Sequence, residues 1–242
     1  MTLPAPNAVL FDFGNTLLRE GPLDLAAGAR RILEIAGDAN GCTPERLAAE
    51  LTDLFADLDA RRRASLLEPP PETVRRLVYD PLGLRFDLPP DEVEWEFWRA
   101  SIPWTAEPGL AALAETLVRR RLSTGVLSNA MFRGRTMERQ LAAAGLSRAF
   151  PWVMTSADWG LRKPHRRVFA LAARRIGVEP GRIWFVGDSY EHDVCGAAEA
   201  GMVPIWYRPA GGAEAPRAPA AAVVSAWIEF RDLLEDTLGR SV

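Results

Sequence analysis

In the second half of the chain, short runs without charged residues and rich in apolar ones are separated by longer segments with helical spacing. The short runs lie at residues 123–128, 152–155, 183–187 and 203–207. Before each run, apolar residues recur every three to four positions, which predicts helices at 110–121, 134–144, 166–176 and 193–200. Strands that are apolar on both faces and alternate with helices are typical of a parallel sheet covered by helices on both sides. We therefore predict an α/β fold, a doubly wound parallel sheet.

Both ends of the chain extend this pattern. The segment 8–13, which is apolar except for Asp12, predicts a first strand, and the spacing at 226–238 predicts a last helix. Residues 209–219 are rich in Pro, Gly and Ala, which predicts a loop before that helix.

A mostly helical segment interrupts the alternation after the first strand. Consecutive prolines near residue 70 break this segment, and helices are expected on either side, one of them at 73–80. Asp91 is the expected N-cap of a further helix, and residues 103–108 form the expected return linker. We predict a core domain made of 1–18 and 106–242, with a helical domain, 19–105, inserted into it.

Composition narrows the possible partners. The 242 residues are 48% hydrophobic with a net charge of −3, so a broadly basic nucleic-acid surface is not expected. No uncharged apolar run reaches the ~18 residues that cross a bilayer, and the first seven residues do not resemble a signal peptide. Two cysteines fit a reducing cytoplasm, and we expect a cytoplasmic monomer or homodimer.

One residue type is almost missing. Of the 29 lysines and arginines, only Lys163 is a lysine. Lysine is a compact point charge on a slim stem, whereas arginine is a broad planar fork. A narrow site between carboxylates has room for the lysine ammonium but not for the arginine guanidinium. Lys163 is therefore a candidate functional residue.

Polar residues follow three of the predicted strands. Asp12, Ser128 and Asp188 stand at or just after carboxyl ends of strands, and Lys163 lies on a loop that enters a helix. In open parallel sheets, ligands bind outside the carboxyl ends of the strands. We expect these four segments to converge on one crevice.

The four segments resemble the motifs of the haloacid dehalogenase-like hydrolase superfamily. The first motif is Phe11-Asp12-Phe13-Gly14-Asn15-Thr16, and the second is Leu127-Ser128-Asn129. The third is Lys163-Pro164, and the fourth begins at Gly187-Asp188 and ends at Asp193. The resemblance covers the whole chain in order and spacing, and the helical insert resembles the family's cap of the first type.

The resemblance implies an aspartyl-phosphate mechanism on a small phosphorylated metabolite. Asp12 would be the nucleophile, and Mg²⁺ would be held by Asp12, the Gly14 carbonyl and Asp188. Lys163 would neutralise Asp12, and Asp193 would hold Lys163 or a metal-bound water.

Several further residues are expected to contact the substrate. Ser128 and the backbone amide of Asn129 would bind the phosphoryl oxygens, next to the loop of Gly14, Asn15 and Thr16. From the cap, one of three consecutive arginines, assigned as Arg63, is a candidate, and so is Arg133 after the second motif.

The sequence departs from the phosphatase pattern at Gly14, where the family carries a second Asp that moves protons. Loss of a positioned general acid typically costs about 10²–10⁴-fold in rate. A phosphohydrolase whose substrate has a good leaving group, or whose cap or substrate supplies the proton, is one interpretation. A metal-independent 2-haloacid dehalogenase is the second, although Asp188 and Asp193 argue for a cation. A non-catalytic member that binds a phosphorylated metabolite or a protein is the third.

Overall fold

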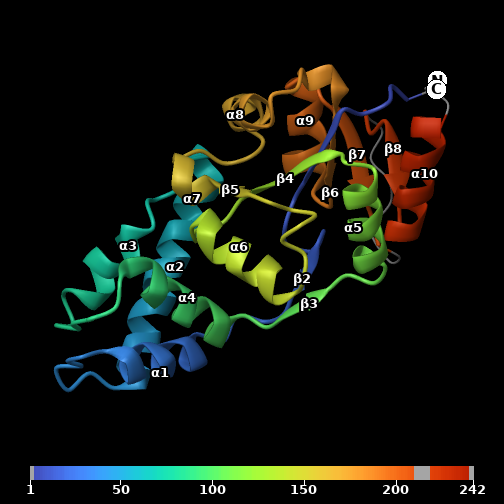
Figure 1. The fold of residues 1–242 in the computed structure, drawn as a ribbon. Helices are drawn as coiled ribbons and strands as arrows, with labels where there is room; N and C mark the ends of the chain where they lie inside the picture. The colour runs from blue at the N-terminus through green and yellow to red at the C-terminus, as the bar shows by residue number, and fades with distance from the viewer. Residues whose placement is uncertain (1–2, 210–218, 240–242) are drawn as a thin grey trace.

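The chain folds into a sheet domain and a helical cap, joined by a two-stranded ribbon (Figure 1). The computed structural model describes residues 3–209 and 219–239. The fold is α/β, as the sequence predicts. Among the described residues, no helix combines the length and apolar character needed to cross a bilayer.

The core sheet has six strands in the order β5-β4-β1-β6-β7-β8, and all neighbours are parallel. The strands are β1 (Ala8–Phe11), β4 (Ser123–Ser128), β5 (Val153–Thr155), β6 (Ile183–Gly187), β7 (Val203–Tyr207) and β8 (Ala222–Val224). The five predicted strands are present within two residues. Strand β8 was not predicted, because an edge strand of three residues is too short to show a recognisable pattern.

Successive residues of β1 pack into different layers of the core. Ala8 and Leu10 contact one buried cluster, whereas Val9 and Phe11 belong to another. This split follows from the two-residue period of a strand, which turns alternate side chains to opposite faces. Both faces are therefore apolar, which is why the strands read as continuous hydrophobic runs.

Helices cover both faces of the sheet. The core helices are α5 (Leu110–Arg119), α6 (Gly134–Ala143), α7 (Ser156–Trp159), α8 (Arg166–Ile176), η2 (Pro180–Arg182), η3 (Tyr190–Cys195), α9 (Gly196–Glu199) and α10 (Trp227–Gly239). The predicted helix at 193–200 is η3 followed by α9, so it begins three residues earlier. Of the predicted loop 209–219, residues 210–218 lie outside the described residues.

The cap has its own core, formed mainly by side chains of its helices. These are α1 (Leu25–Ile35), α2 (Pro44–Ser65), α3 (Glu72–Val74), η1 (Arg75–Tyr79) and α4 (Pro90–Ser101). The predicted helix at 73–80 is present as α3 continued by the π-helical turn η1. The N-cap prediction for Asp91 is wrong: α4 begins at Pro90, where the missing N–H of proline costs nothing, and Asp91 lies in its first turn.

Strands β2 (Leu18–Glu20) and β3 (Trp104–Ala106) pair antiparallel where the chain passes between core and cap. The expected domain boundaries, 18/19 and 105/106, fall inside this ribbon. The expected return linker at 103–108 contains β3. Both strands were missed, because three residues show no periodicity.

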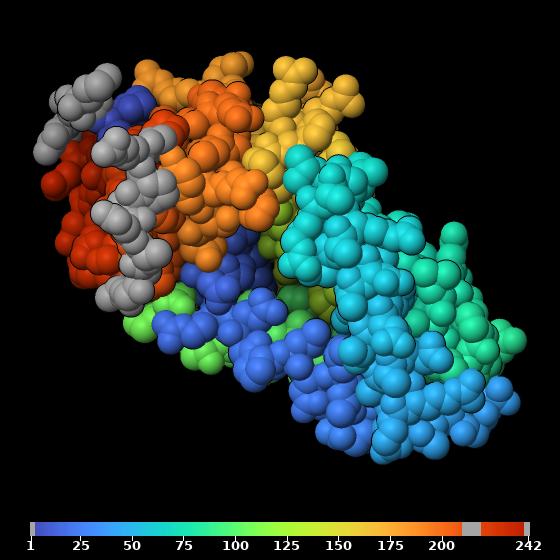
Figure 2. All heavy atoms as spheres, turned by 180° about the vertical axis from the view of Figure 1, so that it is seen from behind, coloured from blue at the N-terminus to red at the C-terminus, as the bar shows by residue number. Residues whose placement is uncertain are grey.

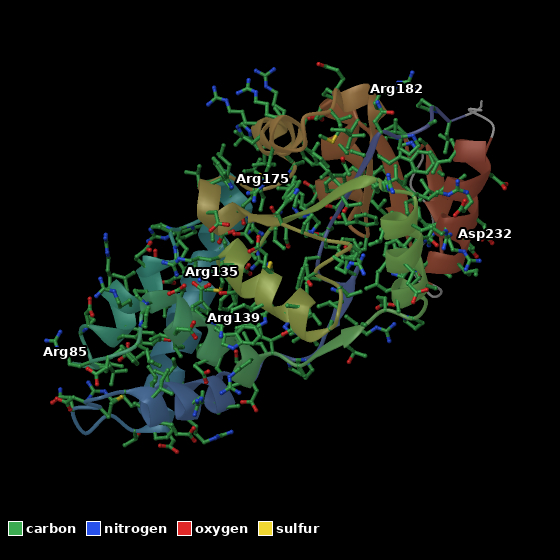
Figure 3. All side chains as sticks on the ribbon, viewed as in Figure 1. Arg85, Arg135, Arg139, Arg175, Arg182 and Asp232 are labelled. Atoms are coloured by element: carbon green, nitrogen blue, oxygen red, sulfur yellow. The ribbon has the colours of Figure 1, made fainter. Side chains whose placement is uncertain are left out.

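The cap also rests on the core along α4 and α6. Acidic residues of α4 face basic residues of α6 or its N-terminus, and Arg135 and Arg139 mark this seam in Figure 3. The ion pairs are Glu94–Arg133 at 2.7 Å, Asp91–Arg135 at 3.1 Å and Glu92–Arg139 at 2.9 Å. A second contact is the buried Glu68 of the cap, which accepts a 2.7 Å hydrogen bond from the Ser156 hydroxyl of the core.

Candidate active site

Lys163 lies between two aspartates at the carboxyl edge of the sheet. Its Nζ donates to Asp12 Oδ1 and to Asp193 Oδ1, both at 2.6 Å, and its side chain is 2% exposed. The Asp12 N–H donates to the Val186 carbonyl at 2.8 Å, which fixes the nucleophile candidate at the end of β1. The narrow gap between carboxylates explains why this position carries a lysine.

The second motif positions the third. The Asn129 side chain accepts from the Lys163 N–H at 2.7 Å and donates to the Lys163 carbonyl at 3.0 Å. An amide side chain can make both bonds at once, because it carries a donor and an acceptor. Ser128 ends β4, is buried, and lines the crevice beside Lys163.

Asp188 and Asp193 are held by the loop that follows β6. The Ser189 N–H donates to Asp193 Oδ2 at 3.0 Å, and Thr16 Oγ1 donates to Asp188 Oδ1 at 3.3 Å. A Cβ at Gly187 would stand 2.4 Å from the Asp193 carboxyl carbon, so only glycine allows this approach. Thr16, expected to contact substrate, is instead fully buried and supports Asp188.

Three carboxylates here share a single ammonium. Ligand oxygens of Asp12, Asp188 and Asp193 all lie within 4.8 Å of one another. Burial, together with the charge of Asp12, raises the pKa of Asp188 to about 6. Burial opposes the charge on Lys163, yet the two neighbouring carboxylates raise its pKa. The uncompensated negative charge and the hard oxygen donors fit a divalent cation such as Mg²⁺.

Glu20 lies beside the position where the family pattern has its second acid. A Cβ built on Gly14 would have one neighbour within 4 Å, Glu20 Oε2 at 3.8 Å. The side chain of Asn15 accepts from the Glu20 N–H at 3.3 Å and so ties β2 to the loop of the first motif. Burial, and then the charge of Asp12, raises the pKa of Glu20.

No sequence pattern predicts the place of Glu20 in the site. Its carboxylate reaches the crevice because the chain turns back after Thr16 and forms β2. No motif spacing marks position 20. The only available signal was the missing acid at Gly14, which indicates that a replacement is needed without saying where it lies.

Of the candidate arginines, the structure brings neither Arg63 nor Arg133 to the three clustered carboxylates. The Arg63 side chain is 77% exposed and pairs with Asp59 one helical turn away. Arg133 is bound by Glu72 and Glu94 at the seam between cap and core. Arg62, whose side chain is 13% exposed, lines the crevice instead, because the helix turns its two neighbours outward.

The crevice lies between the domains and has a volume of about 310 Å³. Figure 2 shows a hollow between the orange atoms of the core and the cyan atoms of the cap. Its core wall includes Asp12, Gly14, Asn15, Ser128, Asn129, Lys163, Asp188 and Asp193. Its opposite wall includes Glu20, Leu23, Phe55, Arg62, Trp98, Ile102 and Trp104.

Comparison with known proteins agrees with this arrangement. A family model described as haloacid dehalogenase-like hydrolase matches residues 6–201. Glyceraldehyde 3-phosphate phosphatase from Methanopyrus kandleri is 39% identical over 69 residues, which cover 28% of this chain and 30% of the relative. Phosphoserine phosphatase from Thermus thermophilus is 31% identical over 115 residues, covering 48% and 45%.

Each match to these two curated relatives spans less than half of the relative's length. A solved structure of 2-haloacid dehalogenase from Pseudomonas syringae pv. Tomato DC3000 superposes with a TM-score of 0.63 at 22% identity. That superposition covers 98% of this chain and 100% of the other, and it concerns the fold alone. The family model spans most of the chain and includes all four motifs, so this protein belongs to the haloacid dehalogenase-like hydrolases.

Proposed function

We propose that the protein is a Mg²⁺-dependent phosphohydrolase that acts on a small phosphorylated metabolite through an aspartyl-phosphate on Asp12. The observation that supports this most is the buried group of three carboxylates around one ammonium. Such a group attracts a cation, and a cation together with Lys163 offsets the repulsion between a carboxylate and a phosphate ester.

Asp12 is the proposed nucleophile. One of its carboxylate oxygens attacks phosphorus in line, the bond to the leaving oxygen breaks, and an acyl phosphate forms. Water then attacks the same phosphorus, which releases phosphate and restores the Asp12 carboxylate. Lys163 holds Asp12 in place through a 2.6 Å hydrogen bond, while Asp193 fixes the ammonium from its other side at 2.6 Å.

Asp12, Asp188 and the Gly14 carbonyl are the residues that would hold Mg²⁺. When bound, the ion supplies positive charge next to the transferring phosphoryl oxygens. Ser128 and the Asn129 backbone amide, on the same core wall of the crevice, are assigned to the same oxygens.

Protonation of the leaving group is assigned to Glu20, since Gly14 has no side chain to perform it. The Glu20 carboxylate then regains a proton from the water that attacks the acyl phosphate. The Glu20 carboxylate lies 3.8 Å from the position that a Cβ at Gly14 would occupy, which is close to where the second Asp of related phosphatases would act. Glu20 belongs to the ribbon that leads into the cap, so cap position and proton transfer are linked. Without Glu20, only substrates with good leaving groups are expected to react.

The names of two similar proteins and the size of the crevice support a small phosphate ester as the substrate class. Two of the similar proteins carry the names glyceraldehyde 3-phosphate phosphatase and phosphoserine phosphatase, and both names denote small phosphate esters. A space of about 310 Å³ suits a molecule of that size. Arg62 brings a guanidinium to the cap side. Its terminal nitrogens pair with Glu68 at 3.4 Å and Asp59 at 3.6 Å, and its buried Nε has no hydrogen-bond partner among the described residues.

A panel of small phosphate esters and of 2-haloacids, assayed with and without Mg²⁺, tests this function. We expect turnover of at least one ester only with Mg²⁺, and its loss in Asp12→Asn. Release of halide from 2-haloacids without the ion would establish the dehalogenase interpretation instead. Binding without turnover of any substrate would support a non-catalytic role.

A further inference from the structure

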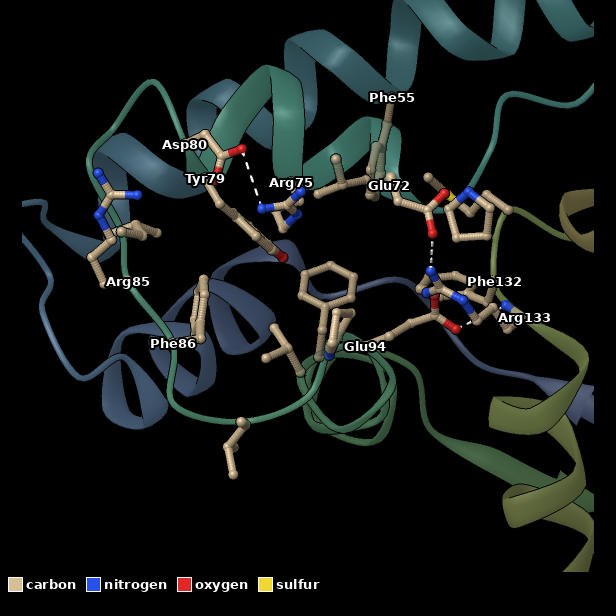
Figure 4. A pocket seen from close by; sticks show the side chains of 18 residues that line it. Phe55, Glu72, Arg75, Tyr79, Asp80, Arg85, Phe86, Glu94, Phe132 and Arg133 are labelled. Carbon is tan, nitrogen blue, oxygen red and sulfur yellow. Dashed lines mark hydrogen bonds and ion pairs between the residues drawn. The ribbon is translucent and has the colours of Figure 1, made fainter.

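A second cavity, of about 320 Å³, lies in the cap beside the catalytic crevice (Figure 4). Its walls come mostly from η1, the following loop and α4, with residues 131–133 of the core closing one side. The aromatic side chains that line it are Phe55, Tyr79, Phe86, Phe97 and Phe132. No catalytic carboxylate takes part, so this cavity is separate from the proposed active site.

Tyr79 presents to the cavity a hydroxyl that has no hydrogen-bond partner among the described residues. Tyr79 is 6% exposed, and in Figure 4 its hydroxyl points into the space between the rings. Burial, together with the charge of Glu94, raises its pKa, so the hydroxyl stays protonated and able to donate. A hydroxyl with no protein partner is free to donate a hydrogen bond to an acceptor bound in the cavity.

Most of the charged groups around the cavity, Arg85 excepted, already have partners. Arg75 pairs with Asp80 at 3.5 Å, and Arg133 pairs with Glu94 at 2.7 Å and also with Glu72. Arg85, which also lines the cavity, is solvent-exposed. A charged ligand would lose its hydration without finding a free counter-charge inside, so an uncharged ligand fits better.

We propose that this cavity binds a small uncharged aromatic molecule whose ring packs among the phenylalanines and whose oxygen or nitrogen acceptor receives a hydrogen bond from Tyr79. Aromatic rings gain edge-to-face and offset contacts with such walls beyond the area they bury. An apolar cavity of about 150 Å³ suffices to bind benzene in another protein, so 320 Å³ holds a substituted ring. Most binding pockets share this composition of apolar walls with few polar groups.

The position of the cavity connects it to the catalytic crevice. Phe55, Met131 and Phe132 line both spaces. A ligand in the cap would therefore press against side chains that also shape the substrate site. The binding proposal itself does not depend on the proposed function.

Benzamide is a suitable probe, because it combines a planar ring, one carbonyl acceptor and no charge. Its dissociation constant is measured by ligand-observed NMR on the full chain, beside those of toluene and cyclohexanecarboxamide. We expect benzamide to bind in the millimolar range and cyclohexanecarboxamide to bind more weakly. Failure of benzamide to bind at 10 mM, or equal binding of the saturated ring, overturns the proposal.

Two substitutions locate the probe. Tyr79→Phe should weaken benzamide about threefold to tenfold and leave toluene unchanged, whereas Tyr190→Phe, outside the cavity, should change neither. Val93→Phe fills the space and should weaken both probes at least about tenfold, with Val93→Ile as its control.

Asp12→Asn, in the catalytic crevice, should have no effect on the binding of either probe. Binding that is lost in Asp12→Asn but kept in Tyr79→Phe would assign the probe to the catalytic crevice and refute the proposal.

Discussion

At position 163, size matters as much as charge. The ammonium has 2.6 Å contacts on two sides and almost no exposure, so a planar guanidinium cannot enter without moving Asp12 or Asp193. The chain uses arginine at every other basic position, which makes this site the one place where its preference is reversed.

We predict that Lys163→Arg, although it conserves charge, lowers kcat at least about 100-fold, because a displaced nucleophile loses its alignment. Overpacking should also reduce the free energy of unfolding by about 1–3 kcal/mol. Steady-state kinetics and urea denaturation measure both effects. Arg63→Lys, at an exposed position, is the matched control and should change stability by less than about 0.5 kcal/mol. Wild-type turnover in Lys163→Arg would show that the tight fit is unimportant.

Substitutions at Glu20 and Gly14 test whether Glu20 protonates the leaving group. Glu20→Gln keeps the shape of the side chain and removes its acidic proton. The kcat/KM for alkyl phosphates should therefore fall about 10²-fold or more. For p-nitrophenyl phosphate, whose leaving group needs no proton, the change should be small. A leaving-group series of several phosphate esters measures this difference, with Glu50→Gln in the exposed part of α2 as control.

Gly14→Asp in the Glu20→Gln background extends that test. Position 14 has room for a Cβ, and its backbone is outside the left-handed region, so an aspartate is sterically accepted. The double variant should recover much of the lost alkyl phosphatase activity. Equal losses across all leaving groups in Glu20→Gln, without recovery in the double variant, would remove Glu20 from proton transfer.

At the scale of elements, the cap and core meet through charges on α4 and α6. These charges differ in depth: the Arg133 pair with Glu94 is largely buried, whereas the Arg135 side chain in the pair with Asp91 is 73% exposed. Exposed ion pairs contribute little because water and salt screen them, while a buried partner left alone is costly. The stability of the contact between cap and core therefore depends mainly on the buried Arg133–Glu94 pair.

We predict that Arg133→Met lowers the free energy of unfolding by about 2–3 kcal/mol, since Glu94 loses the guanidinium that compensates its burial. Arg135→Met, on the same helix, should change it by less than about 0.5 kcal/mol. Chemical denaturation of both variants measures the contrast. Similar effects of the two substitutions would mean that the Arg133–Glu94 pair contributes no more to the free energy of unfolding than the exposed pair does.

At the scale of the whole molecule, cation binding and folding should be coupled. The three aspartates belong to segments separated by more than 170 residues, and only the folded sheet brings them within 4.8 Å. A ligand that binds the folded state alone stabilises it by mass action, by about 2.7 kcal/mol at a hundredfold excess over Kd.

Mg²⁺ at saturating concentration should therefore raise the thermal midpoint by roughly 5–10 °C for a chain of this size. Differential scanning calorimetry with and without the ion measures the shift. Asp188→Asn should abolish it, whereas Asp57→Asn, on the exposed face of α2, should retain it. A full shift in Asp188→Asn would show that the ion binds elsewhere.

Much of the fold and the centre of the site could be predicted from the sequence. Apolar runs are a local property, and the carboxyl ends of parallel strands meet at one edge, so the convergence of Asp12, Ser128 and Asp188 follows from the strand pattern. Lys163 was recognisable as the single lysine. The structure brings all four to one crevice.

The remaining features depend on contacts that the local sequence does not encode. Glu20 reaches Gly14 only because the chain folds back as β2, and β2 exists only through its pairing with β3, 84 to 88 residues later. The orientation of α2 against the core turns Arg62 rather than Arg63 toward the crevice, and packing of α4 on α6 encloses Arg133. The sequence determined which residue types stand at the strand ends. Tertiary packing decided which side chains from the cap meet them, because that choice depends on how one domain is oriented on the other and on no periodicity within either.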